Sequence, residues 1–313
     1  MVATAFLFPG QGSQAVGMGK ALADAFPEAR AVFDAADDAL GDHLFRLCCE
    51  GPESELVLTR NTQPAILTMS IAAHAVWSAR GGTAAAFVAG HSLGEYSALV
   101  AAGALSLPDA VRAVRARGTF MQEAVPAGTG AMAAVLGLDA DAVTRICAEA
   151  AGSEVVSPAN FNSPEQTVIA GHASAVERAS AKLKEAGAKR VVPLSVSAPF
   201  HCALMEPVKP RLQEVLARGV ISAPRIPVVT NVEATPNSDR ARVVPLLLAQ
   251  VSAPVRWVES IRALGAAGVT RVVELGPGKV LGGLVKRISK EIEVLNVEDP
   301  ASLEKSLAAA AGR

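Results

Sequence analysis

Short apolar segments of strand length alternate with longer amphipathic segments along most of this 313-residue chain. The apolar segments predict strands at residues 5–8, 84–89, 226–230, 272–275 and 294–297. The segments between them have the apolar periodicity of helices and lie at residues 17–40, 64–80, 205–218, 242–251, 255–267 and 279–289. Strands and helices in alternation form a mostly parallel sheet covered by helices, so the pattern predicts the α/β class.

A different order of elements occupies residues 131–196. The apolar pattern there predicts strand, helix, two strands, helix and strand, which is the βαββαβ order of a ferredoxin-like unit. The flanking stretches "PAGTG" and "SAPFH" have the composition of hinges. We therefore predict a subdomain at residues 127–197, inserted into a discontinuous domain made of residues 1–126 and 198–313.

The composition excludes several classes of protein. Half of the residues are hydrophobic, yet no apolar run approaches the roughly 18 residues of a membrane span, and the N-terminus lacks the basic region of a signal peptide. The net charge is −1 and the basic residues are dispersed, which argues against nucleic-acid binding. The four cysteines lack metal-ligand spacing. We expect a cytoplasmic monomer without a metal or a permanently bound cofactor.

The segment "GHSLG" contains the strongest signal for catalysis. It follows a predicted strand, precedes a predicted helix, and spaces Gly90, Ser92 and Gly94 as in a nucleophile elbow. Such a turn exposes the serine hydroxyl and leaves backbone N–H groups free at a helix start. The alternative is a serine N-cap with incidental glycines, which the spacing alone does not exclude.

A nucleophilic serine needs a base, and His201 is the best candidate among five histidines. It lies in a loop that ends the inserted unit, where it can face the elbow across a cleft. His91 is next to Ser92, but neighbouring side chains at a strand end point to opposite sides, so we expect His91 to pack behind the elbow.

The third member of a catalytic triad is missing from the pattern. The aspartates between the serine and the histidine all occur where helices are expected to begin, and they are Asp109, Asp139 and Asp141. We therefore favour a serine–histidine dyad, in which a backbone or amide oxygen orients the imidazole.

An arginine indicates the kind of substrate. On a helical wheel of residues 109–125, Arg117 lies at the centre of the apolar stripe that includes Met121. A buried guanidinium is costly unless it is paired, and its shape suits a carboxylate. The partner is either an acidic residue of the fold or the free carboxylate of an acyl substrate, and a guanidinium that reaches solvent is the third alternative.

A glycine-rich loop at residues 8–19 follows the first predicted strand. Its backbone N–H groups can point into a site, so the amides of Gln11 and Leu93 are candidates for an oxyanion hole. The loop lacks the spacing of a phosphate-binding loop.

Six segments together resemble the malonyl-CoA:acyl carrier protein transacylase family, in the same order and over nearly the whole chain. They lie at residues 8–19, 90–99, 115–122, 159–171, 197–205 and 274–284. The resemblance implies a hydrolase-like α/β core with a mostly parallel sheet and a ferredoxin-like subdomain, in agreement with the patterns above.

The resemblance also implies roles for individual residues. Ser92 would be the acylated nucleophile, His201 its base, and Arg117 the clamp for a malonyl carboxylate. The remaining positions implied for the site are Gln11 and Leu93 at the oxyanion, Gln250 orienting the histidine through its main-chain carbonyl, and Met121, Asn160, Asn162 and Phe200 around the substrate.

The implied reaction moves a malonyl group from malonyl-CoA to the phosphopantetheine thiol of a holo acyl carrier protein. It would proceed in a ping-pong manner through a malonyl-serine, release CoA, and supply fatty acid or polyketide synthesis. A serine thioesterase and a non-catalytic module that binds acyl-CoA or the carrier remain as alternatives. Basic residues at 189, 190 and 286–290 could face an acidic carrier, although solvated surface positions explain them as well.

Overall fold

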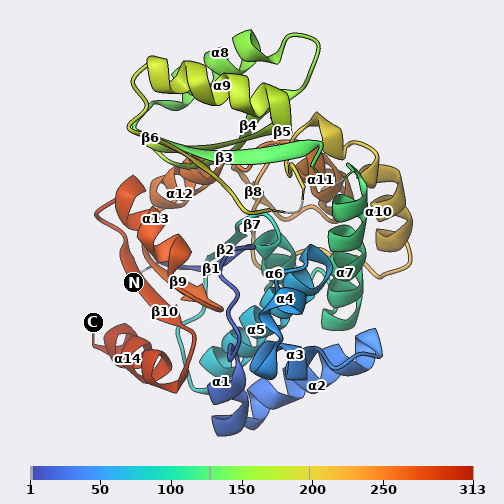
Figure 1. Ribbon diagram of the computed structural model, residues 1–313. Helices are drawn as coiled ribbons and strands as arrows, with labels where there is room; N and C mark the ends of the chain where they lie inside the picture. Colours follow the sequence, from blue (N-terminus) through green and yellow to red (C-terminus); the bar gives the residue numbers. More distant parts are fainter. Residues whose placement is uncertain (1–2, 127, 197, 313) are drawn as a thin grey trace.

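The computed structural model describes residues 3–126, 128–196 and 198–312, and two β-sheets organise this part of the chain (Figure 1). Sheet A has six strands in the order β10-β9-β1-β2-β7-β8, and only the β7–β8 pair is antiparallel. Its strands are β1 (Ala3–Phe8), β2 (Phe87–Gly90), β7 (Val228–Val229), β8 (Pro236–Asn237), β9 (Val269–Leu275) and β10 (Glu293–Val297). The predicted α/β class with a mostly parallel sheet is confirmed.

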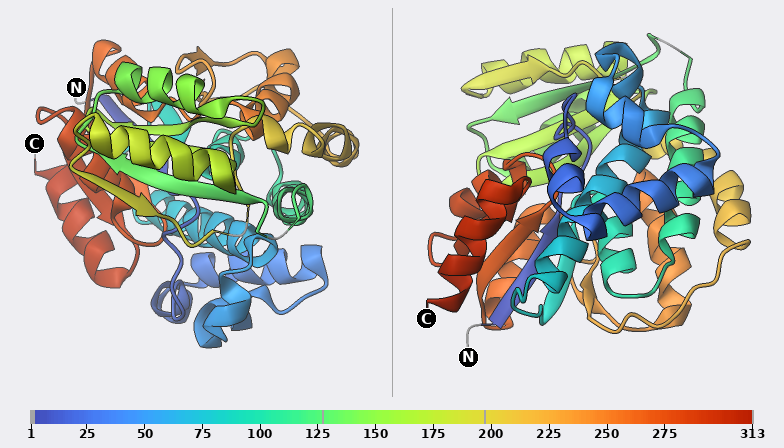
Figure 2. Two further views of the ribbon diagram at one scale, coloured as in Figure 1. Left: turned by 45° about the horizontal axis from the view of Figure 1, so that its top comes forward. Right: turned by 90° about the horizontal axis from the view of Figure 1, so that it is seen from below.

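Helices cover both faces of sheet A (Figure 2). The helices outside the predicted inserted unit are α1 (Lys20–Ala25), α2 (Pro27–Leu40), α3 (Leu44–Glu50), α4 (Glu53–Leu56), α5 (Thr59–Ala79), α6 (Gly94–Ala101), α7 (Leu107–Glu123), η1 (Ala203–Met205), α10 (Val208–Leu216), α11 (Arg240–Ser252), α12 (Trp257–Ala266), α13 (Val280–Ile288) and α14 (Pro300–Ala311).

Strand β1 shows why its sequence is apolar at every position. Ala5 and Leu7 pack into a core cluster with α12 and α13, whereas Phe6 and Phe8 pack on the opposite face with α5. Successive side chains of a strand point to opposite faces, so a strand covered on both sides needs a continuous apolar run. Because its strands are parallel, sheet A brings the carboxyl ends of β1 and β2 to one edge, where the catalytic loops begin.

Sheet B contains β3 (Gly130–Leu136), β4 (Val156–Ser163), β5 (Gln166–His172) and β6 (Arg190–Pro193). It is antiparallel, with the order β4-β5-β3-β6, and α8 (Ala140–Ala151) and α9 (Ala173–Glu185) lie on its side away from sheet A (Figure 1). The ferredoxin-like arrangement is therefore confirmed. Residues 127 and 197, where the domains were predicted to divide, lie outside the described residues, so the division into 1–126 with 198–313 and 127–197 stays a prediction.

Two helices differ from the prediction for physical reasons. Residues 17–40, predicted as mostly helical, form the two helices α1 and α2, because Phe26 is extended before Pro27, a position at which helical backbone is disfavoured. The helix predicted from Pro64 begins at Thr59. Nearly all of its first three turns are buried, so tertiary packing outweighs the hydrogen bond that Pro64 cannot make.

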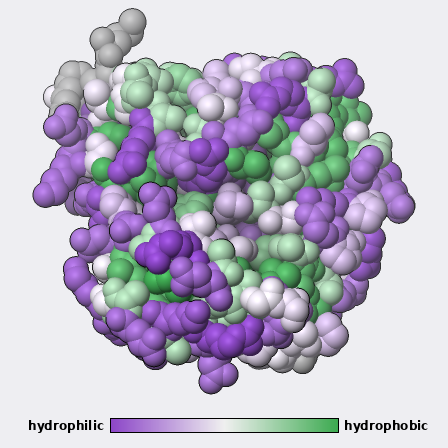
Figure 3. Space-filling model, turned by 90° about the horizontal axis from the view of Figure 1, so that it is seen from above, coloured by the Kyte–Doolittle hydropathy of each residue, from purple (hydrophilic) through white to green (hydrophobic). Residues whose placement is uncertain are grey.

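No helix within residues 3–126, 128–196 and 198–312 has both the length and the hydrophobicity needed to cross a membrane. On the face formed by α8 and α9, hydrophilic side chains are spread among hydrophobic ones (Figure 3).

Candidate active site

The turn between β2 and α6 is a nucleophile elbow with Ser92 at its tip. Ser92 has a φ of 51°, which is unusual for a residue with a side chain. A Cβ on Gly90 would lie 1.9 Å from the backbone of Gly94, and a Cβ on Gly94 would lie 2.0 Å from the carbonyl oxygen of Phe8. Both glycines are therefore required. Ser92 does not cap the helix, which excludes the N-cap alternative.

Asn231, just after β7, braces this turn. Its Oδ1 accepts a hydrogen bond from the backbone N–H of Ser92 at 2.7 Å, and its Nδ2 donates to the carbonyl oxygen of Gly90 at 2.7 Å. The side chain is completely buried, so these bonds replace water for both backbone groups. Asn231 was not predicted from the sequence, because its role depends on the neighbouring strand.

The structure brings Ser92 and His201 together. Ser92 Oγ lies 2.7 Å from Nε2 of His201, and Nδ1 of His201 lies 2.9 Å from the carbonyl oxygen of Gln250. A carbonyl only accepts, so Nδ1 carries the proton and Nε2 is free to receive the serine proton. Burial, with a smaller contribution from the nearby Arg117, lowers the pKa of His201 to about 3. The imidazole is therefore neutral at physiological pH.

The backbone around the elbow offers two hydrogen-bond donors. Among the described residues, neither the N–H of Gln11 nor that of Leu93 has an acceptor within the protein. Leu93 directly precedes α6, and Gln11 lies in the loop after β1 and lines the same cavity as Ser92. Two unpaired amides beside a nucleophile are what an oxyanion needs.

Arg117 reaches the nucleophile from α7 and is almost completely buried. Its Nη1 donates to Oε1 of Gln63 at 2.9 Å, and its Nη2 donates to Ser92 Oγ at 3.2 Å and to Oε1 of Gln250 at 3.0 Å. Within the described residues, no carboxylate lies within 4.0 Å of the guanidinium. The direct hydrogen-bond partners of this cation are therefore all neutral groups.

A buried carboxyl group, Glu95, lies behind this arrangement in the first turn of α6. Its Oε2 accepts hydrogen bonds from Nε2 of Gln250 at 2.7 Å and from the backbone N–H of Asn231 at 3.1 Å. Burial raises its pKa to about 7. Sequence reasoning missed Glu95 and Gln63, although a charged residue three positions after the serine in an apolar helix start was a usable signal.

The other predicted site residues lie at different depths. Phe200 and Asn160 line the Ser92 cavity of about 120 Å³. Oδ1 of Asn162 accepts a hydrogen bond from Nε2 of His91 at 2.8 Å, and Asn162 lines an adjoining cavity of about 200 Å³. Met121 is absent from both linings and contacts the amide of Gln63, so it lies behind the clamp.

His91 only partly matches its predicted position behind the elbow. Its ring packs edge-on against Trp257, which lies behind the turn, but it also borders both cavities. It faces Asn162 and not the serine hydroxyl, so the base geometry belongs to His201.

A basic cavity of about 600 Å³ lies farther along α13. The basic residues that the sequence analysis singled out lie together in its lining, and they are Lys189, Arg190, Lys286, Arg287 and Lys290. The 200 Å³ cavity is lined by the first turns of α13 and shares Gln11 and Asn160 with the serine cavity. The serine cavity and the 200 Å³ cavity thus adjoin, and the basic cavity is lined by residues farther along α13 and just beyond it.

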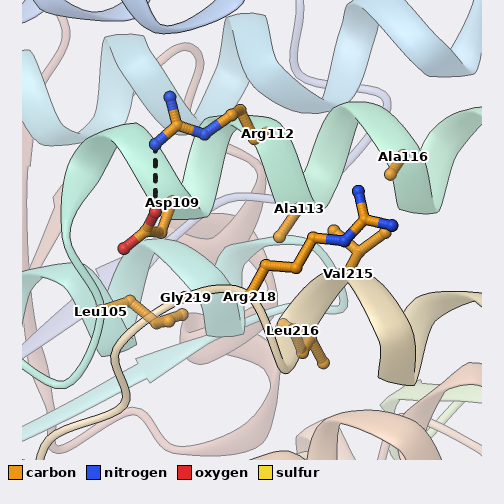
Figure 4. Close-up of a pocket in the computed structure, with 9 residues that line it drawn as sticks. All are labelled: Leu105, Asp109, Arg112, Ala113, Ala116, Val215, Leu216, Arg218 and Gly219. Atoms are coloured by element: carbon orange, nitrogen blue, oxygen red, sulfur yellow. Dashed lines mark hydrogen bonds and ion pairs between the residues drawn. The ribbon is translucent and has the colours of Figure 1, made fainter.

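A separate cavity of about 340 Å³ lies between α7 and α10 (Figure 4). It shares no lining residue with the serine cavity. Asp109, at its edge, bonds Arg112 and lies in the first turn of α7, as predicted for a helix-start aspartate. Asp139 likewise caps α8. No described group of three or more histidine, cysteine or acidic residues could hold a metal ion.

An elbow serine on a parallel sheet, paired with a histidine and flanked by free amides, defines an α/β enzyme of the serine hydrolase and acyltransferase class. The acyl transferase domain family matches residues 5–305. The malonyl CoA-acyl carrier protein transacylase of Escherichia coli K12 is 50% identical over 98% of this chain and 99% of its own length. That of Bacillus subtilis 168 is 51% identical over 97% of this chain and 96% of its own length.

Two solved structures of proteins named as malonyl transferases also match the fold of this chain. An acyl carrier protein S-malonyltransferase from Vibrio cholerae matches with a TM-score of 0.95 and 50% identity, over 96% of this chain and 99% of that one. A malonyl-transacylase in complex with a type II polyketide synthase acyl-carrier protein matches with a TM-score of 0.96 and 48% identity, over 98% of this chain and 99% of that one. The chain therefore belongs to the malonyl CoA-acyl carrier protein transacylase family.

Proposed function

We propose that this protein transfers the malonyl group of malonyl-CoA to the phosphopantetheine thiol of a holo acyl carrier protein. The observation that carries the proposal is the buried Arg117, whose Nη2 lies 3.2 Å from Ser92 Oγ and which has no carboxylate in contact among the residues described. A desolvated guanidinium in that position suits an acyl group that carries its own carboxylate.

The first half of the reaction follows from the geometry. Nε2 of His201 accepts the proton of Ser92 Oγ as the oxygen attacks the thioester carbonyl, and the amides of Gln11 and Leu93 hold the resulting oxyanion. The carbon–sulfur bond then breaks, and the CoA sulfur leaves with the proton from His201. A malonyl ester of Ser92 remains.

The second half repeats these steps in reverse. The carrier thiol gives its proton to His201 and attacks the ester carbonyl, and Ser92 Oγ departs with that proton. The carbonyl oxygen of Gln250 keeps the imidazole in one tautomer through both halves, which is the orienting role that a carboxylate has in a triad.

The cavities around Ser92 and α13 suit a substrate that has a pantetheine arm and an anionic end. The two smaller cavities adjoin each other between Ser92 and α13, and the basic cavity is lined by residues farther along α13 and just beyond it. Its lysines and arginines are exposed, so they can meet either the phosphates of CoA or an acidic carrier surface. The homologous complex with an acyl-carrier protein supports this choice of partner.

The test is intact-protein mass after brief exposure to malonyl-CoA, followed by addition of holo carrier protein. We expect a malonyl adduct that is lost when the carrier is added, together with malonyl carrier. Ser92→Ala is the control and should form no adduct. Free malonate without malonyl carrier would instead identify a thioesterase, and binding without any adduct would identify a non-catalytic module.

A further inference from the structure

Glu95 and Arg117 are the two ends of one buried hydrogen-bonded chain. The side-chain amide of Gln250 joins them, because its Nε2 donates to Glu95 at 2.7 Å while its Oε1 accepts from Arg117 at 3.0 Å. Glu95 is 2% exposed and Arg117 1% exposed. The proposed mechanism uses Arg117 but gives Glu95 no role.

Arg117 is charged at neutral pH, and Glu95, whose pKa burial raises to about 7, is ionised above that pH. The other titratable groups that face them are His201 and His91, whose pKa values burial lowers, and Tyr96, whose pKa burial raises to about 12. All three are therefore neutral. With Glu95 ionised, the buried charges cancel, and the carboxylate contributes to holding the guanidinium in place.

A malonyl group disturbs this balance, whereas an acetyl group does not. The malonyl carboxylate adds a second negative charge to a single guanidinium, and like charges in a desolvated site favour protonation of one of them. The substrate carboxylate is the more acidic of the two and contacts Arg117 directly, so Glu95 is the group that accepts the proton. A neutral acyl group brings no such charge.

We infer that Glu95 is the counter-charge and positioning residue of the clamp: it balances Arg117 in the free enzyme and becomes neutral when the acyl carboxylate occupies the guanidinium. This inference rests on the proposed malonyl transfer and adds a specificity-determining residue to it. Because linkage is reciprocal, protonation of Glu95 strengthens the preference for malonyl over neutral acyl groups.

The direction of the pH effect follows from the raised pKa of Glu95, which is about 7. Below pH 7, Glu95 is already protonated and malonyl binding needs no proton. Above pH 7, Glu95 must take up a proton from solution each time a malonyl group binds, so the malonyl-to-acetyl ratio of kcat/KM falls by up to about tenfold per pH unit. The ratio cancels the titration of His201 and of CoA, which both substrates share.

The experiment measures this ratio from pH 6 to pH 9 in the unmodified protein, in Glu95→Gln and in Glu274→Gln. The amide introduced by Glu95→Gln can still accept the two hydrogen bonds but carries no charge. We expect the ratio to fall above pH 7 in the unmodified protein and to be independent of pH in Glu95→Gln. Glu274 is the matched control, because burial also raises its pKa to about 7 but its bonds go to α13. In Glu274→Gln, the malonyl-to-acetyl ratio should still fall above pH 7, as it does in the unmodified protein.

Proton uptake provides a second measurement that needs no variant. A pH indicator in weak buffer at pH 8 should report close to one proton taken up per malonyl-serine formed and none per acetyl-serine. Equal uptake for the two acyl groups, or an unchanged pH profile in Glu95→Gln, would overturn the inference. Mass spectra of the same samples show whether the malonyl adduct forms, so failure of the proposed function is recognised separately.

Discussion

The Arg117→Ala substitution should impair malonyl transfer much more than acetyl transfer. The guanidinium is buried between Gln63, Gln250 and Ser92, so a malonyl carboxylate that reaches it loses its water and gains a paired cation. Removing the arginine leaves that carboxylate buried and unpaired, at a cost of about 3–5 kcal/mol. The corresponding loss in kcat/KM for malonyl-CoA is roughly 150-fold to 5,000-fold.

Acetyl-CoA should lose far less in the same variant, because its methyl group forms no ion pair. The assay compares transfer of the two acyl groups to holo carrier protein at one pH. Arg115→Ala is the matched control, since Arg115 belongs to the same helix but bonds Asn61 and the surface residue Asp42. Equal losses for malonyl and acetyl transfer in Arg117→Ala would refute the clamp.

Three further predictions concern the groups behind the nucleophile. Gln250→Ala keeps the main-chain carbonyl that holds His201 but removes the amide that holds Arg117 and donates to the carbonyl oxygen of Ser92. Malonyl transfer should therefore fall roughly 10-fold to 100-fold and acetyl transfer by less, as steady-state kinetics will show. Asn231→Ala leaves two backbone groups of the elbow unpaired, and urea denaturation should show a loss of about 2–4 kcal/mol in the free energy of unfolding, whereas a loss below about 0.5 kcal/mol would contradict the brace. Because the pKa of His201 is lowered to about 3, kcat/KM for acetyl-CoA should stay constant from pH 8 down to pH 5; a midpoint near 6.5 would show that the base is not desolvated.

The elbow is the part of the site that the sequence predicted best. A strand, two glycines around Ser92 and a helix start are neighbours in the chain. The steric need for Gly90 is local, because its Cβ would meet Gly94, whereas Gly94 is required by Phe8 on the neighbouring strand. The position of Arg117 on the apolar stripe of its helix was also readable, because helical periodicity is local.

Other parts of the site required the resemblance or escaped prediction. Ser92 and His201 are 109 residues apart, and Gln250 lies farther along the chain, so no local pattern reports their hydrogen bonds. Pro64 misled the prediction of α5, because propensity carries less weight than burial in a packed helix.

The elbow, the buried arginine and most of the order of strands and helices were readable from the chain before any fold was known, but helices α3, α4 and α14 were not predicted. These features follow from side-chain periodicity and backbone sterics, which act between near neighbours. Only the tertiary structure joins Glu95 to Arg117 by hydrogen bonds through the side chain of Gln250. The tertiary structure also raises the pKa of Glu95 and lowers that of His201. Burial removes water from every charge at once, so the state of each group depends on all the others that the fold brings to it.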